Sequence, residues 1–146
     1  MRCTHTINIE APIEKVFGLV HDPENLKLWL DGVEETTFTE PFDPANPIGA
    51  RFKQKIREGG RLAEYDGEVT AFAPPKHLGV RIFNKVFSVQ VDYHFTPSGM
   101  GTRLDYAADL SCGNWIFRFL AFLFSWFTKR MLRKALVKLK ALAEAG

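Results

Sequence analysis

The stretch that decides the fold is Asn114–Ala145, which reads NWIFRFLAFLFSWFTKRMLRKALVKLKALAEA. Its second half carries apolar residues that recur at helical spacing between basic ones: Met131, Leu132, Leu136, Leu139 and Leu142. Spacing of this kind puts the apolar side chains on one side of a helix, which then packs against the rest of the protein. We therefore predict one long C-terminal helix around which the rest of the chain is organised.

The first half of this helix, Trp115–Phe127, is apolar at every position except Arg118 and Ser125. We extend the inward direction of the second half backwards at about 100° per residue. The predicted inner positions are then mostly small: Phe117, Ala121, Ser125 and Thr128. A strip of large apolar residues falls on the opposite side: Ile116, Phe119, Leu123 and Trp126. The helix is thus predicted to leave space on its inner side and an apolar strip on its outer side.

Length and composition favour a single domain, residues 1–146, with a mild charge. The formal net charge of +2 gives no indication of nucleic-acid binding. The chain has thirteen phenylalanines, which is many for its length. The apolar run Trp115–Phe127 is shorter than the roughly 20 residues that a membrane-spanning helix needs, so we predict no such helix there. Residues Met1–His5 begin no hydrophobic signal segment, so we expect a cytoplasmic protein.

Upstream of the helix, the sequence predicts one strand, two short helices and six further strands. Residues Cys3–Ile9 alternate as a half-buried strand does. Pro12 opens a helix with an apolar stripe, and Asp22 and Pro23 are typical of the cap and first residue of a second helix. The later strands are predicted near Leu30–Phe38, Ala50–Arg57, Leu62–Phe72, Leu78–Phe83, Phe87–Thr96 and Arg103–Cys112. This order indicates an α+β fold with an antiparallel meander.

Alternation along these strands assigns side chains to an inner face, towards the helix, or to an outer face. Acidic side chains fall on the outer face, opposite lysine and arginine: Glu64, Asp66, Glu68, Asp92, Asp105 and Asp109. We interpret them as solvent-exposed cross-strand pairs, so no carboxylate is predicted inside. Small residues on the inner side favour a cavity over a filled core: Ala63, Gly67, Ala71, Ala108, Ala121 and Ser125.

The predicted ligand site combines the few polar groups of the inner face with small and apolar neighbours. Its residues are His5, Gln54, Tyr65, Val89, Tyr93, Tyr106, Ala108, Phe117, Ala121 and Ser125. A mostly apolar cavity with a few polar groups orients one polar end of a ligand. In the alternative, the tyrosines are core aromatics whose hydroxyls reach a backbone partner or the rim.

The sequence carries no pattern that predicts a metal or a cofactor. His21, His77 and His94 share no metal-ligand spacing with each other or with a cysteine, so we expect neither. His5 is the inward candidate for acid–base chemistry, but a lone histidine in a strand is more often structural. We therefore assign no catalytic residue.

The opening of the chain carries a resemblance to a known superfamily. It reads Ile9-x-Ala11-Pro12-x-x-x-Val16-Phe17-x-x-Val20-x-Asp22-Pro23-x-Asn25-x-x-x-Trp29. This pattern resembles the START-like, birch-allergen-like superfamily, and within it bacterial polyketide cyclase/dehydrase and lipid-transport-type (SRPBCC) proteins. The resemblance implies a helix-grip fold, in which a curved seven-stranded antiparallel sheet wraps around the long C-terminal helix and leaves a ligand cavity. Members bind lipids, sterols or polyketides, and some catalyse cyclisation or dehydration.

The same resemblance bears on the two cysteines. In the resembled topology the first and last strands pair antiparallel, so Cys3 and Cys112 are expected to be near neighbours. A reducing cytosol favours two free thiols over a disulfide.

Two functions from different classes follow from these observations. The first is a carrier or sensor of a lipid, isoprenoid or polyketide-like molecule, favoured by the lack of an inward carboxylate. The alternative is a cyclase or dehydratase of a polyketide-like substrate that uses tyrosine hydroxyls and His5. A third, weaker interpretation is a domain whose cavity has collapsed.

The outer strip of the helix, Ile116, Phe119, Leu123 and Trp126, also needs an explanation. A contiguous apolar strip on a protein surface usually marks a site of contact with a protein, a membrane or a ligand. The strip is either buried by the proline-rich loop and short helices, or held on a membrane surface, or paired in a homodimer.

Overall fold

The computed structural model describes residues 2–30, 33–58, 61–84, 87–112 and 132–145. Its elements in chain order are β1 (Arg2–Ile9), α1 (Ile13–His21), α2 (Pro23–Trp29), β2 (Val33–Phe38), β3 (Arg51–Glu58), β4 (Arg61–Ala73), β5 (His77–Phe83), β6 (Phe87–Ser98) and β7 (Gly101–Cys112). A C-terminal helix follows over residues 132–144. The predicted order of strands and helices is confirmed over the described residues.

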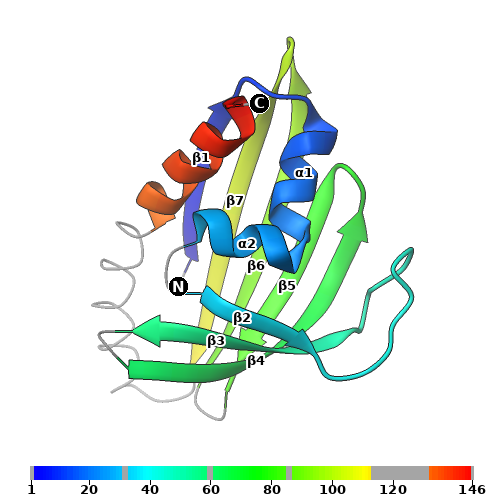
Figure 1. The fold of residues 1–146 in the computed structure, drawn as a ribbon, viewed down its shortest axis with the longest axis vertical. Coiled ribbons are helices and arrows are strands. Elements are labelled where there is room, and N and C mark those ends of the chain that lie inside the picture. Colours follow the sequence, from blue (N-terminus) through cyan, green and yellow to red (C-terminus); the bar gives the residue numbers. More distant parts are fainter. Residues whose placement is uncertain (1, 31–32, 59–60, 85–86, 113–131, 146) are drawn as a thin grey trace.

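The strands form one 7-stranded antiparallel sheet in the order β1-β7-β6-β5-β4-β3-β2. Strands β2 to β7 follow one another as a meander, and β1 joins the sheet by pairing with β7. Figure 1 shows the sheet bending, with β2, β3 and β4 crossing below α2 while β5, β6 and β7 run behind α1. The helices therefore lie on one face of the sheet, its inner face.

The two short helices are fixed by local chemistry that the sequence makes visible. The Asp22 carboxylate accepts a hydrogen bond from the Glu24 N–H at 3.0 Å, and Pro23 begins α2, where its missing N–H costs nothing. The indole of Trp29, which is fully buried, donates to the Leu19 carbonyl at 2.9 Å. This bond ties the end of α2 back to α1.

The core lies between the inner face of the sheet and the helices. Its side chains, each 5% exposed or less, include Ile9, Val16, Phe17, Val20, Trp29, Phe95, Leu104, Leu136 and Leu139. They come from β1, β6, β7 and from all the described helices. Burial on this scale stabilises each large side chain by about 1.5–3 kcal/mol.

The described part of the C-terminal helix confirms the amphipathic pattern. Its inward leucines are buried: Leu132, Leu136 and Leu139. Val137 is 58% exposed on the other side. The Lys140 ammonium donates to the Asn8 carbonyl at 2.9 Å, which fastens the helix to β1. Among the described residues, no helix is long and apolar enough to cross a membrane.

One irregularity in β4 changes which side chains face inward. The pairing with β5 shifts by one residue between Val69 and Ala71, so Thr70 is an extra residue in β4. Side chains beyond it change face. The prediction that Ala71 faces inward is therefore wrong, and Phe72 takes the inward position with its ring centroid 5.8 Å from that of Phe17.

The register of β1 and β7 also corrects the expectation for the cysteines. Cys3 lies opposite Ala108, and Cys112 lies four residues further along β7. At about 3.3 Å per residue these strand positions are roughly 13 Å apart. A disulfide needs Cα atoms within about 7 Å, so the two residues are not near neighbours and the strands would have to slide to join them.

Candidate functional site

A cavity of about 400 Å³ lies between the inner face of the sheet and the helices. Apolar side chains from β3 to β6 form much of its floor: Phe52, Val69, Leu78, Val80, Ile82 and Val91. Its cover comes from α1, α2, β2 and the loop after β2, with Leu132 of the C-terminal helix at one side. The volume and the apolar lining are typical of a small-molecule site.

The loop between β2 and β3 covers the cavity by aromatic contacts. The Phe38 ring packs 4.3 Å from the Phe42 ring and 5.7 Å from the Phe52 ring, between centroids. Pro44 and Pro47 of the same loop also line the cavity. The proline-rich segment is thus part of the wall, a role that strand alternation does not predict for a loop.

Gly67 on β4 shows how a small residue shapes this wall. A Cβ built at Gly67 would overlap atoms Cε2 and Cζ of the Phe52 ring and lie 2.9 Å from its Cδ2. The ring therefore lies directly on the glycine. The space above Gly67 is filled by an aromatic side chain, and the cavity begins beyond that ring.

One polar group of the cavity is an amide. Gln54 of β3 is 7% exposed, and its Nε2 donates to the Thr36 hydroxyl of β2 at 3.2 Å. Both residues line the cavity. A buried amide of this kind is stable because it is hydrogen-bonded, and it gives the apolar wall one polar end.

Two tyrosines form a second polar point. Tyr93 and Tyr106 line the cavity and pack edge to face, with centroids 5.2 Å apart. Burial, and secondarily the neighbouring Tyr106, raises the pKa of Tyr93 well above its usual 10.0. Its hydroxyl therefore stays protonated at neutral pH and can act as a hydrogen-bonding group but not as a base.

The rim carries two titratable side chains. His21 stacks on Phe17, with centroids 5.3 Å apart, and Asp22 borders the cavity beside it. Asp22 is the one carboxylate among the described lining residues, a position that strand alternation did not predict. Its carboxylate accepts the Glu24 N–H, so its position is set by the capping of α2.

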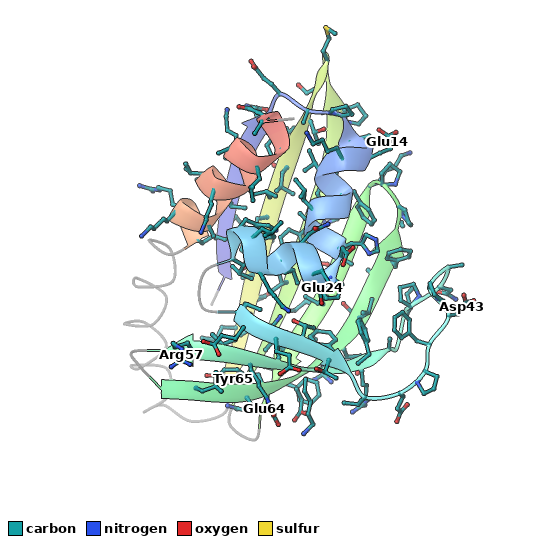
Figure 2. All side chains as sticks on the ribbon, viewed as in Figure 1. Glu14, Glu24, Asp43, Arg57, Glu64 and Tyr65 are labelled. Carbon is teal, nitrogen blue, oxygen red and sulfur yellow. The ribbon has the colours of Figure 1, made fainter. Side chains whose placement is uncertain are left out.

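The residues predicted for the ligand site divide into three groups. Gln54, Tyr93 and Tyr106 line the cavity. His5, Tyr65, Val89 and Ala108 take inner-face positions in the sheet but are not among its described lining residues. Phe117, Ala121 and Ser125 lie outside the described residues. Figure 2 shows Arg57, Glu64 and Tyr65 at the end of the molecule formed by β3 and β4, away from Asp43 on the loop that covers the cavity.

Several lining residues were not predicted. Phe72 was missed because the bulge at Thr70 reverses its face. Trp29 and Leu26 lie on a helix whose orientation the sequence leaves open. The outer strip, Ile116, Phe119, Leu123 and Trp126, lies outside the described residues, so its burial, membrane contact and dimer contact stay predictions.

Three acidic residues of the outer face, Glu64, Asp66 and Glu68, pair with lysine or arginine of a neighbouring strand as predicted, whereas the partner described for Asp92 is His77. Lys53 lies 3.3 Å from Glu64, between Nζ and Oε1. Arg51 and Arg81 each lie 3.6 Å from Glu68. These cross-strand pairs are largely exposed and contribute little to stability.

A curved antiparallel sheet that encloses an apolar cavity with a C-terminal helix defines a helix-grip protein. The model of one family, described as "Polyketide cyclase / dehydrase and lipid transport", matches residues 1–144. The chain belongs to this family. No curated protein matches it in sequence.

Solved structures share the fold over nearly the whole chain. A protein of Thermus thermophilus is 20% identical with a TM-score of 0.78, and the match covers 99% of this chain and 98% of that one. Ara h 8.0201 is 12% identical with a TM-score of 0.73, over 100% and 99% of the two chains. The di-domain ARO/CYC StfQ of the steffimycin biosynthetic pathway is 11% identical with a TM-score of 0.79, and 99% of this chain covers 51% of it. At these identities the likeness shows the fold alone.

Proposed function

We propose that the protein binds a hydrophobic small molecule in this cavity, as a carrier or sensor of a lipid, an isoprenoid or a polyketide-like molecule. The observation that carries the proposal is the apolar cavity of about 400 Å³ with its few polar groups. Apolar surface removed from water contributes about 25 cal/mol per Å², which supplies affinity. The polar groups supply orientation.

The polar groups favour a ligand whose polar end is uncharged. The described lining contains neither lysine nor arginine. A charged ligand group buried there would lack a partner of opposite charge, which is costly. A hydroxyl, ketone or ester instead matches the amide of Gln54 and the phenol of Tyr93.

A cyclase or dehydratase of a polyketide-like substrate is the second candidate. The family description includes cyclase and dehydrase activity, and the adjacent phenols of Tyr93 and Tyr106 suit a substrate carbonyl. Proton abstraction, however, requires a base. Tyr93 stays protonated, the Asp22 carboxylate caps α2, and the remaining candidate, His21, is exposed at the rim and stacked on Phe17, so we place binding before catalysis. Tyr93→Phe distinguishes binding from catalysis. The substitution removes a hydroxyl that a cyclase or dehydratase would use as a donor, but it leaves most of the apolar lining on which binding depends.

The test is a titration with retinol, a neutral fluorescent isoprenoid alcohol. Val91→Phe adds a ring to the floor of the cavity, since Val91 lines it and is 8% exposed. Thr96→Phe adds the same ring at an exposed position of the same strand. We expect saturable 1:1 binding to the wild type and to Thr96→Phe, with a large loss in Val91→Phe. Equal binding by all three proteins, or none by the wild type, contradicts the proposal.

A further inference from the structure

A cluster of two histidines and one aspartate lies on the outer face, on the opposite side of the sheet from the cavity. His77 of β5 lies directly opposite His94 of β6. Their rings stack with centroids 4.1 Å apart and planes inclined by 16°. Asp92 lies two residues before His94 on the same face of β6, and its Oδ1 is 2.9 Å from Nε2 of His77.

These three side chains present a compact set of metal-binding atoms. One candidate ligand atom from each residue lies within 4.8 Å of the others. Two imidazoles and one carboxylate suit Zn²⁺ and neighbouring divalent transition metals, and three protein ligands leave a position for water. We propose that His77, Asp92 and His94 bind a divalent transition metal ion, with Zn²⁺ as the preferred ion.

The surroundings leave room for the carboxylate. A Cβ built at Gly79 would lie 2.9 Å from Oδ1 of Asp92 and 2.9 Å from the Thr70 hydroxyl oxygen. A larger residue at position 79 would crowd both of these atoms, so the glycine leaves space for the Asp92 carboxylate. The side chains of His77 and Asp92 are only 28% and 29% exposed, so the ligands are partly held in place before an ion arrives.

Asp92 also differs in its partner from Glu64 and Glu68 on the same face. Glu64 and Glu68 lie next to lysine or arginine side chains. The partner described for Asp92 is instead the imidazole of His77, at 2.9 Å between Oδ1 and Nε2. A divalent ion bound at this point would add positive charge beside the Asp92 carboxylate.

Binding requires one local adjustment. The lone pairs of the ring nitrogens lie in the ring planes, so two nearly parallel rings do not converge on one ion. His94 is exposed and can turn towards the ion, while the contact with the Asp92 carboxylate fixes the position of His77. The bound ion then links β5 to β6 and stabilises the folded state.

The experiment is calorimetric titration of the tag-free protein with Zn²⁺ and with Co²⁺. We expect one saturable site per chain and at least about tenfold weaker binding in His94→Gln and in His77→Gln. Asp92→Asn weakens binding because the amide is neutral. His21→Gln is the matched control, since His21 lies beside the cavity on the other face of the sheet, and metal binding by this variant is expected to match the wild type.

Two further measurements, Co²⁺ absorption and thermal unfolding, test which residues bind the ion and whether binding stabilises the fold. The Co²⁺ complex should show visible absorption without a thiolate-to-cobalt charge-transfer band, which excludes Cys3 and Cys112 as ligands. Zn²⁺ should raise the thermal midpoint of the wild type but not of His94→Gln, whose metal-free midpoint should equal that of the wild type because His94 is exposed. The absence of saturable binding, undiminished binding by His94→Gln, or a thiolate band overturns the proposal. Val91→Phe should keep the metal site, so this test does not depend on the cavity.

Discussion

Gly67→Ala tests whether the cavity wall is shaped by the contact between a glycine and an aromatic ring. The added Cβ would overlap the Phe52 ring, which lies on Gly67 in the neighbouring strand. Phe52 is 6% exposed and lines the cavity. Because the sheet lies beneath the ring and Phe38 packs against it, a ring that gives way to the added Cβ moves away from the sheet, towards the cavity. The substitution should therefore lower both stability and ligand capacity.

The size of the effect follows from two opposing contributions. Inserting a methyl group into a packed core typically costs about 1–3 kcal/mol. Replacing glycine by alanine restricts the unfolded chain and returns about 0.4–1 kcal/mol. The free energy of unfolding should therefore fall by about 1.3 kcal/mol at the centre of these ranges and by at most about 2.6 kcal/mol. At about 2–4 °C per kcal/mol for a chain near this size, the central value lowers the thermal midpoint by about 3–5 °C.

The assay is thermal unfolding followed by circular dichroism, together with retinol titration. Gly18→Ala is the matched control, because a Cβ at Gly18 in α1 has no heavy atom outside its own stretch of helix within 4 Å. Alanine there should stabilise the helix by about 0.5–1 kcal/mol and leave retinol binding unchanged. The reasoning is refuted if Gly67→Ala keeps the wild-type midpoint and affinity, or if Gly18→Ala loses as much as Gly67→Ala.

Three further predictions concern the C-terminal helix and the polar groups of the cavity. Leu139→Ala should lower the free energy of unfolding in denaturant by about 2–5 kcal/mol, because Leu139 is fully buried. Val137→Ala, at a position 58% exposed, should change it by no more than about 0.5 kcal/mol. Similar losses in the two variants would contradict the packing of the C-terminal helix against the sheet. Because burial raises the pKa of Tyr93, its stabilising contribution is present below about pH 10 and is lost as the pH rises and the unfolded chain ionises. Tyr93→Phe should therefore lose less stability than the wild type between about pH 10 and 11, and parallel pH profiles would contradict this. Gln54→Leu removes the hydrogen bond to Thr36 and should weaken binding of retinol more than binding of the corresponding hydrocarbon without the hydroxyl; equal losses would exclude an orienting role.

Local signals in the sequence predicted most of the elements. The cap at Asp22 and the proline at Pro23 act within one turn, so the start of α2 is readable from neighbouring residues. Alternation likewise assigned the inner face of β6, where Val91, Tyr93 and Phe95 are buried. Both the start of α2 and the inner face of β6 are set by residues close together in the sequence, which is why they could be predicted.

The cavity could be predicted only in part, because much of its wall depends on contacts between distant segments. The bulge at Thr70 reverses the face of Phe72, and no residue near it signals an extra position in the strand. The loop that carries Phe42 reaches the cavity through its contact with Phe38, which becomes visible only in three dimensions.

The histidine cluster illustrates the same limit on the outer face. His77 and His94 are separated by a whole hairpin, so a search for ligand spacing along the chain finds nothing. The register of β5 and β6 places them opposite each other. Cross-strand register therefore decides this cluster, as it decides the separation of the cysteine positions.

The most direct measurement is native mass spectrometry of the protein as purified, followed by identification of any released molecule. The account predicts one uncharged, mainly apolar molecule per chain in the wild type, and its absence from Val91→Phe at equal folded content. A wild-type chain that carries nothing and takes up no retinol, or a Val91→Phe chain that retains the same molecule, would contradict a ligand held between the sheet and the helices.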